Sequence, residues 1–138
     1  IDGGGIIHRG GTAETILMFA NHRRFFTPPN DCIGQIELLR ADAPEKKIIV
    51  EADTVEEAKA ALLGYPDILQ LDKFTLEQIT ELLEFARRIA PSCLISVAGG
   101  INKYNIQNYA ATGVSLIVTS APYYAEPNDI KVVLQPID

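Results

Sequence analysis

The sequence is poor in cysteine and lacks the cysteine patterns of a disulfide framework or a metal site. Its 138 residues contain two cysteines, Cys32 and Cys93, which lie far apart and belong to no CxxC pair. No histidine and cysteine cluster has the spacing of metal ligands, and no Ser-His-Asp or Cys-His pair is recognisable. We therefore expect two free, buried thiols in a reducing, cytoplasmic protein.

Long basic runs and long apolar runs are also missing. The net charge is −6, and no basic run is longer than the pairs Arg23-Arg24 and Arg87-Arg88, which argues against a nucleic-acid partner. No apolar run approaches the roughly 20 residues of a membrane span, so no membrane partner is expected. The first residue is Ile1, and the glycine-rich opening resembles the middle of a chain. We expect one domain, which is a piece of a longer protein.

The sequence does contain a repeated unit: a short apolar run, a polar or glycine-containing end, and an amphipathic segment. Capping boxes that begin at Thr54 and Thr75, and the candidate N-caps Asp31 and Asn102, predict a helix after each of the first four runs. Such alternation is typical of right-handed βαβ units around a parallel sheet. The predicted strands are residues 16–19 (ending at 20–22), 47–50, 68–71, 94–97 and 116–118, with a further edge strand at 129–134.

The polar strand ends favour a barrel over an open dinucleotide-binding sheet. No GxGxxG follows the first predicted strand, as a dinucleotide fold would require. Polar or glycine ends instead follow several successive strands, which is how barrels build one site from many strand ends. Five strands are too few to close an eight-stranded ring. The predicted fold class is therefore α/β, an incomplete (β/α) TIM-like barrel.

Two carboxylates, Glu51 and Asp72, directly follow neighbouring predicted strands. The carboxyl ends of parallel strands meet at one edge, so both side chains are expected at a common mouth. Such a pair suits sugar hydroxyls, or Mg²⁺ that arrives with a phosphorylated ligand. The alternative is that either carboxylate caps the following helix or pairs with Lys73.

Gly99 and Gly100 follow the fourth predicted strand, and Asn102 is the candidate N-cap of the next helix. Free N–H groups in such a turn, together with the helix dipole, favour an anion. The alternative is a tight connection without a ligand. His8 and Arg9 lie between glycines, where a guanidinium suits a carboxylate or phosphate but an ordinary surface loop is the alternative.

Six motifs resemble, in order and spacing, those of quinolinate phosphoribosyltransferases, and the resemblance covers nearly the whole chain. Within that family the chain is most similar to the ModD branch, pyrophosphorylase-like proteins associated with molybdenum-transport operons, on residues 15–22 and 36–41. The motifs are GGGIIHR at 3–9, NH at 21–22, IVEAD at 49–53, LDKF at 71–74, VAGGI at 97–101 and TGV at 112–114.

The resemblance implies a homodimeric enzyme of NAD biosynthesis in which an N-terminal sandwich domain of one subunit covers the barrel mouth of the other. Residues 1–138 would be the C-terminal part of the barrel. The reaction would transfer phosphoribose from phosphoribosyl pyrophosphate to a pyridine-carboxylate base, with Mg²⁺, and release pyrophosphate.

The resemblance also implies a role for each candidate residue. Glu51 and Asp72 would be catalytic and would hold the ribose hydroxyls and Mg²⁺. The base would contact His8, Arg9, Phe19, Asn21 and His22. The 5′-phosphate would bind at Ala98, Gly99, Gly100, Thr119 and Ser120. His22 could equally be a histidine at the edge of the core that is hydrogen-bonded to the backbone.

Two positions depart from the family pattern. Phe19 stands where quinolinate enzymes place a lysine, and Thr119-Ser120 replaces a small residue followed by glycine. Loss of a cation from a dicarboxylate site is costly, which favours a less charged base or nicotinate. The competing hypotheses are another phosphate-binding barrel enzyme that acts on a nucleotide, and a non-catalytic binding module.

Overall fold

The computed structural model describes residues 4–11, 14–28 and 31–136. In this part of the chain five parallel strands form one sheet, in the order β1-β2-β3-β4-β5. The strands are β1 (Ile16–Met18), β2 (Ile48–Ala52), β3 (Ile68–Asp72), β4 (Leu94–Ala98) and β5 (Leu116–Ile117). The helices are α1 (Ala20–Arg23), α2 (Cys32–Asp42), α3 (Val55–Leu62), α4 (Leu76–Ile89), α5 (Ile106–Ala111) and the 3₁₀ turn η1 (Ala121–Tyr124).

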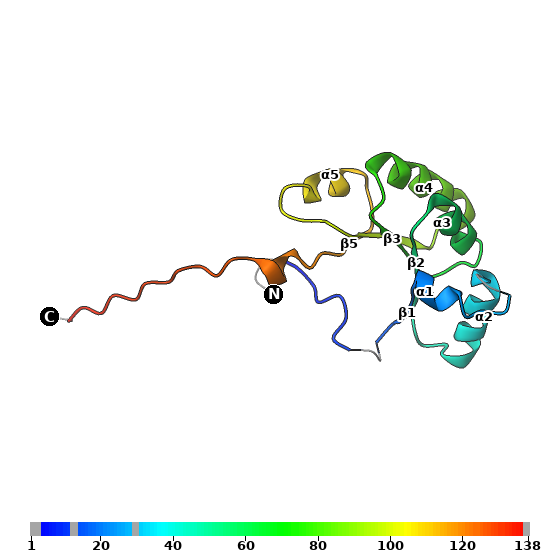
Figure 1. Ribbon diagram of the computed structural model, residues 1–138, viewed down its shortest axis with the longest axis horizontal. Coiled ribbons are helices and arrows are strands. Elements are labelled where there is room, and N and C mark those ends of the chain that lie inside the picture. The colour runs from blue at the N-terminus through cyan, green and yellow to red at the C-terminus, as the bar shows by residue number, and fades with distance from the viewer. Residues whose placement is uncertain (1–3, 12–13, 29–30, 137–138) are drawn as a thin grey trace.

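The order of the strands confirms the predicted fold class. Consecutive strands are neighbours throughout the sheet, and Figure 1 shows α2, α3, α4 and α5 along one side of it. A doubly wound sheet has helices on both faces and reverses its strand order, whereas a barrel winds continuously in one direction. The five strands therefore form an open segment of a (β/α) barrel.

The strand register separates an apolar face from a polar one. Val50, Leu69 and Ile95 are paired across β2, β3 and β4 and belong to the buried core against the helices. The next row, Glu51, Gln70 and Ser96, points to the opposite face because side chains alternate along a strand. A polar row therefore crosses the inner face near the carboxyl ends of the strands.

Two helix starts were predicted as capping boxes, and one of the two boxes is complete. At α4 the capping box is complete, because Thr75 and Gln78 exchange side-chain and backbone hydrogen bonds. At α3 the Thr54 hydroxyl accepts the Glu57 N–H at 3.2 Å, but the Glu57 carboxylate accepts the Asp53 N–H instead of returning to Thr54. The predicted capping box at Thr54 is therefore only half formed.

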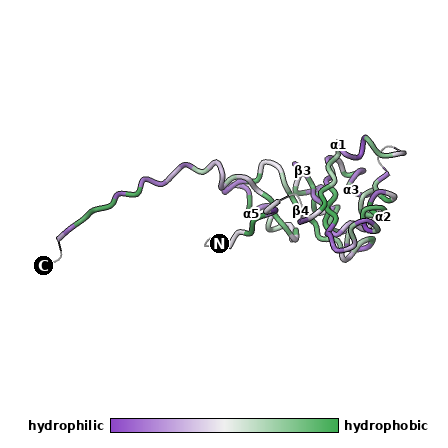
Figure 2. The backbone as a smooth tube through the Cα atoms, turned by 90° about the horizontal axis from the view of Figure 1, so that it is seen from below, coloured by the Kyte–Doolittle hydropathy of each residue, from purple (hydrophilic) through white to green (hydrophobic). Residues whose placement is uncertain are grey.

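Two predictions at the ends of the sheet are wrong. Strand β1 ends at Met18, and residues 20–22 lie in the one-turn helix α1 rather than at a strand end. Residues 129–134 form no strand, and the backbone extends away from the sheet there (Figures 1 and 2). The side chains of these residues are exposed. A β-rich segment becomes a strand only by pairing, and none of the described strands pairs with this one.

The described cysteines behave as expected: Cys32 and Cys93 are both free and buried. Burial raises the pKa of the Cys93 thiol to about 11, so the thiol stays protonated near neutral pH. No helix within the described ranges is both long and apolar enough to cross a membrane.

Candidate functional site

Parallel pairing brings the predicted strand-end residues to one edge of the sheet. Glu51 is the next-to-last residue of β2, Asp72 is the last of β3, and Ala98 is the last of β4. Asp72 and Ala98 are register partners, and Glu51 lies two rows before them, in the row of Gln70 and Ser96. Glu51 therefore lies within β2, not beyond it as predicted, and this places its side chain on the inner face.

The Glu51 carboxylate is half-buried and held by a neighbouring strand. Gln70, its register partner, donates a hydrogen bond from Nε2 to Glu51 Oε2 at 2.7 Å. Burial raises the pKa of Glu51 above its usual range, and the nearby charges of Asp72 and Asp53 add to the effect. The Gln70 hydrogen bond and the Arg23 charge oppose that rise in pKa. The carboxylate is thus oriented but easier to protonate than an exposed glutamate.

Asp72 has a direct partner in the next residue. The Lys73 Nζ lies 2.9 Å from Asp72 Oδ2, as the alternative interpretation of Asp72 anticipated. Lys73 is mostly exposed and has a left-handed φ of 59°. Its backbone N–H donates to Ala98 O at 2.9 Å, which ties the end of β3 to the end of β4. The ion pair does not exclude a ligand, because surface pairs are weak and readily exchanged.

Gly99 and Gly100 turn away from β4 with φ values of +86° and +72°. A Cβ on Gly99 would overlap Asp72 Oδ1 and the Lys73 side chain, whereas a Cβ on Gly100 would meet nothing within 4 Å. Both residues need the left-handed region, but only Gly99 is also required by close packing. The turn therefore approaches the Asp72 carboxylate as closely as a backbone can.

A hollow of about 230 Å³ opens between this turn and the segment after β5. Thr119 closes one side, where its hydroxyl donates to Ile101 O at 2.6 Å and accepts the Ala121 N–H at 3.1 Å. The residues that line the hollow are Ala98, Gly99, Gly100, Ile101, Val118, Thr119 and Ser120. The five predicted phosphate-binding residues thus lie together around one concave surface.

The helix after this turn differs from the prediction. Asn102 is not the N-cap of α5; that position is Asn105, whose side chain makes no cap bond and instead accepts the Asn102 N–H at 2.8 Å. Both asparagine side chains donate to Gly100 O, at 3.2 and 3.1 Å. Since α5 has only six residues, and the Thr119 hydroxyl already donates its proton to Ile101 O, the anion-binding potential of this hollow comes from the glycine backbone and not from a helix dipole.

The predicted base-binding residues fall in two groups. His8 and Arg9 lie in the segment that precedes β1, and burial together with the Arg9 charge lowers the pKa of His8. Phe19, Asn21 and His22 lie at α1, immediately after β1. No contact among the described residues joins His8 or Arg9 to the strand-end carboxylates.

Phe19 and His22 interact with each other. Their ring centroids lie 5.5 Å apart at an interplanar angle of 71°, an edge-to-face pair, and the Phe19 N–H donates to His22 Nδ1 at 3.3 Å. His22 therefore makes the backbone hydrogen bond that the sequence left open as an alternative. Its ring is exposed, so His22 Nε2 is available to a ligand.

Sequence reasoning missed three buried polar residues beside the site. Arg23 is 2% exposed, Gln70 5% and Ser96 1%. Gln70 Oε1 and Ser96 Oγ have no hydrogen-bond partner in the described structure, which marks the inner face as polar and unfilled. In the sequence Arg23 is only one member of the basic pair Arg23-Arg24, and nothing there distinguishes it from Arg24. A signal for Gln70 existed: it is a polar residue in the middle of an apolar strand.

The donor set suits Mg²⁺ that is shared with a substrate. No group of three or more His, Cys, Asp or Glu side chains in the described ranges could hold a metal ion. Glu51 and Asp72 are two oxygen donors on neighbouring strands, and Mg²⁺ commonly binds one or two carboxylates plus substrate phosphates and water. The residues present therefore fit a substrate-borne Mg²⁺ and not a fully caged resident ion.

Comparison with known proteins shows the family of the chain. Residues 1–133 match the family described as "Quinolinate phosphoribosyl transferase, C-terminal domain". The chain is 57% identical over 133 residues to "Putative pyrophosphorylase ModD" of Escherichia coli O157:H7, covering 96% of this chain and 47% of that protein. It is 32% identical over 119 residues to the nicotinate-nucleotide pyrophosphorylase (carboxylating) of Mycobacterium leprae (strain TN), covering 86% of this chain and 41% of that protein.

A solved structure shows the same fold. The nicotinate-nucleotide pyrophosphorylase from Francisella tularensis superposes with a TM-score of 0.73 at 29% sequence identity, covering 83% of this chain and 39% of that one. The chain thus spans about half the length of the curated relatives it matches.

Proposed function

The chain belongs to the C-terminal domain family of quinolinate phosphoribosyl transferases, and from this premise we propose that the complete protein is a phosphoribosyltransferase. It transfers phosphoribose from phosphoribosyl pyrophosphate to the ring nitrogen of a pyridine-type base. The bond between ribose C1′ and the pyrophosphate oxygen breaks, a bond from C1′ to the base nitrogen forms, and pyrophosphate leaves. The observation that carries the proposal is the meeting of Glu51, Asp72 and the Gly99-Gly100 hollow at one sheet edge.

The carboxylates of Glu51 and Asp72 stabilise the positive charge that develops on the ribose in the transition state. Positive charge grows on the ribose ring as the C1′–O bond breaks, and preoriented carboxylates stabilise it. Glu51, held by Gln70, is placed to accept hydrogen bonds from ribose hydroxyls, and Asp72 lies two rows further out on the same face. Mg²⁺ bound with the substrate would be held by Glu51 and Asp72 and would neutralise the pyrophosphate.

The hollow beside Gly99 and Gly100 takes the 5′-phosphate. Two successive residues without a Cβ let an anion approach the backbone closely. Holding the phosphate here fixes the ribose over the carboxylates on the neighbouring strands. Although the 5′-phosphate does not take part in the bond changes, binding it contributes to turnover because it positions ribose C1′.

Phe19 determines which base is accepted. The half-buried Phe19 ring at the start of α1, paired with His22, replaces a cation of the family pattern beside the base. Arg9 remains as the cation for a carboxylate, and His8 lies beside it. A base with one carboxylate, such as nicotinate, or an uncharged pyridine therefore fits better than the dicarboxylate quinolinate. A homodimer of the complete protein is part of this proposal.

Pyrophosphate release by the complete protein tests the proposal. The protein is incubated with phosphoribosyl pyrophosphate, Mg²⁺ and one of three bases: quinolinate, nicotinate or an uncharged pyridine. We expect base-dependent release that is fastest with a base less charged than quinolinate and that is lost in Glu51→Ala. Absence of release with every base, in a folded protein that still binds ribose 5-phosphate, would favour another phosphate-binding barrel activity. Light scattering of the same sample tests the homodimer.

A further inference from the structure

The Arg23 side chain is the most deeply buried charged group described. It lies in the one-turn helix α1 and is 2% exposed, although its neighbours His22 and Arg24 are exposed. Arginine is almost never fully buried unless it is paired. A four-residue helix makes few contacts of its own, so the burial of Arg23 fixes where α1 lies on the sheet.

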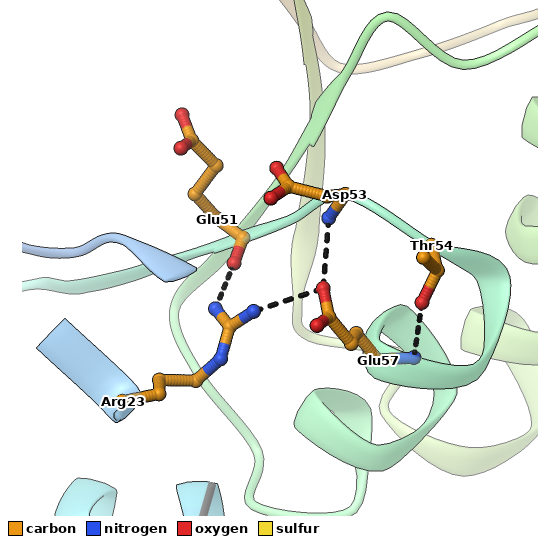
Figure 3. A network of polar contacts seen from close by, with 5 residues as sticks. All are labelled: Arg23, Glu51, Asp53, Thr54 and Glu57. Carbon is orange, nitrogen blue, oxygen red and sulfur yellow. Dashed lines mark hydrogen bonds and ion pairs between the residues drawn. The ribbon is translucent and has the colours of Figure 1, made fainter. Parts of the chain in front are cut away.

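The guanidinium joins two parts of the turn that follows β2. Its Nη1 donates to the backbone oxygen of Glu51, and its Nη2 forms an ion pair with Glu57 Oε2 at 2.9 Å (Figure 3). The same Glu57 oxygen accepts the Asp53 N–H at 3.0 Å. Arg23 and Glu57 therefore hold the polypeptide at Glu51 and at Asp53, on both sides of Ala52.

These contacts orient Glu51 without engaging its carboxylate. Figure 3 shows the Glu51 side chain directed away from the guanidinium, while the carbonyl of the same residue points toward it. Fixing that carbonyl fixes the peptide plane after Glu51, and with it the direction in which the side chain leaves the strand. The carboxylate remains on the inner face, where Gln70 holds it.

We propose that Arg23 is a positioning residue, which through the Glu51 carbonyl and Glu57 sets the end of β2 against α1. This inference rests on the proposed function and extends it to a residue that does not itself contact the proposed substrates. Since α1 also carries Asn21 and His22, Arg23 determines the separation between the base-binding helix and the ribose-binding carboxylate. A planar fork that reaches a carbonyl and a carboxylate at once is a geometry that lysine lacks.

Arg40 offers a matched control elsewhere in the fold. Its Nη2 donates to Tyr65 O at 2.5 Å, and its Nη1 lies 3.4 Å from Asp67 Oδ2. That aspartate accepts the Ile48 N–H, at the opposite end of β2 from Glu51. Arg40 thus joins a carbonyl to a carboxylate as Arg23 does, but far from the strand ends that form the site.

The experiment compares Arg23→Met, Arg23→Lys and Arg40→Met in the complete protein. Amide hydrogen exchange at residues 51–53 reports the position of the strand end, and kcat for pyrophosphate release reports catalysis. We expect Arg23→Met to speed exchange at 51–53 and to lower kcat about 10–100-fold, with ribose 5-phosphate affinity changed less than about twofold. Arg23→Lys should fall between wild type and Arg23→Met, and Arg40→Met should keep wild-type kcat and wild-type exchange at 51–53.

Two results would overturn the inference. One is unchanged exchange at 51–53 in Arg23→Met, and the other is full kcat in that variant. Should Arg23→Met not fold, the same two readouts on Arg23→Lys decide. Should the wild-type protein release no pyrophosphate with any base, the proposed function fails, and the exchange measurement alone decides whether Arg23 fixes the end of β2.

Discussion

The two halves of the candidate site are built differently. On β2 and β3, the carboxylates Glu51 and Asp72 are held by other side chains, Gln70 and Lys73. After β4, Gly99 and Gly100 offer backbone in a conformation that glycine adopts most readily, with no side chain in the way. Side chains can place charge against a transition state, whereas bare backbone lets an anion approach. The difference predicts that changes in the first half impair turnover and that changes in the second impair phosphate binding.

The largest effect should come from the carboxylate half. Glu51→Ala is expected to lower kcat by about 10²–10³-fold, because a preoriented charge of this kind contributes about 3–4 kcal/mol to transition-state stabilisation. Ribose 5-phosphate affinity should stay near the wild-type value, which calorimetry measures. Glu56→Ala is the matched control, since Glu56 is exposed in the first turn of α3. If kcat fell equally in the two variants, Glu51 would have no specific role in catalysis.

Substitution of Gly99 or Gly100 by alanine should lower the free energy of unfolding. Gly99→Ala combines a strained left-handed φ with overlap against Asp72, so we expect a loss of about 2–4 kcal/mol in the free energy of unfolding. Gly100→Ala also forces alanine into a left-handed φ, but the added Cβ meets no other atom within 4 Å. Its loss of unfolding free energy should therefore be only about 1–2 kcal/mol. Urea unfolding measures both. The prediction fails if the two variants are equally stable.

A bulkier residue at Gly100 tests the phosphate assignment itself. Gly100→Val puts a branched side chain at the rim of the hollow and should weaken ribose 5-phosphate binding by about tenfold, near 1.4 kcal/mol. Its kcat at saturating substrate should fall less than that of Glu51→Ala. Unchanged affinity in a variant that remains folded would mean that the turn is only a tight connection.

Phe19 tests whether the base lies over α1. Phe19→Lys restores a cation and should shift kcat/KM for quinolinate relative to nicotinate by about 1–3 kcal/mol, the range of hydrogen bonds to charged groups. Phe25→Lys is the control, since Phe25 is 88% exposed in the neighbouring loop. An unchanged preference in Phe19→Lys would place the base elsewhere.

The smallest effect concerns pH. Burial raises the pKa of Glu51. In the pH profile of kcat/KM, the loss of activity on the acidic side (the acidic limb) should therefore begin above the ordinary pKa of glutamate. Gln70→Leu removes the hydrogen bond that opposes this rise, so the limb should move to higher pH. Gln107→Leu, at an exposed position on α5, should leave the limb in place. A limb that moves to lower pH in Gln70→Leu would contradict the account.

The same shift has a defined sign for stability. A raised pKa means that the folded state binds the Glu51 proton more tightly than the unfolded state. The free energy of unfolding should therefore fall as pH rises from the ordinary glutamate pKa through the raised one. This slope should disappear in Glu51→Gln, which urea titrations at several pH values would detect.

The sequence predicted correctly the elements that depend only on neighbouring residues, namely the buried strands and the capping box at Thr75. The buried runs that became β2, β3 and β4 need no distant partner to be recognised, because parallel strands covered by helices read as continuous apolar segments. The capping box at Thr75 is likewise complete within one turn. The edge position of the candidate site followed from these strands alone.

Side-chain contacts that the strand and N-cap patterns do not include account for two of the errors. Residues 20–22 follow a strand but form α1, which Arg23 anchors through Glu57 on a helix far along the chain. Asn102 has the local signature of an N-cap, but Asn105 takes the position because the two asparagine side chains also bind Gly100. The partner of Arg23 lies outside its own segment, whereas the side-chain contacts of Asn102 and Asn105 all lie within residues 100–105 and are simply not part of an N-cap pattern.

The most direct test is to locate bound ribose 5-phosphate. The complete protein is labelled with ¹⁵N and titrated with ribose 5-phosphate while amide chemical shifts are recorded. We expect the largest changes at Gly99, Gly100 and Ser120, with Gly113, a left-handed glycine in another turn, as an internal control that does not respond. Changes that centre on Gly113, or that leave Gly99 and Gly100 unaffected at saturation, would contradict a phosphoribosyl site at the carboxyl edge of this sheet.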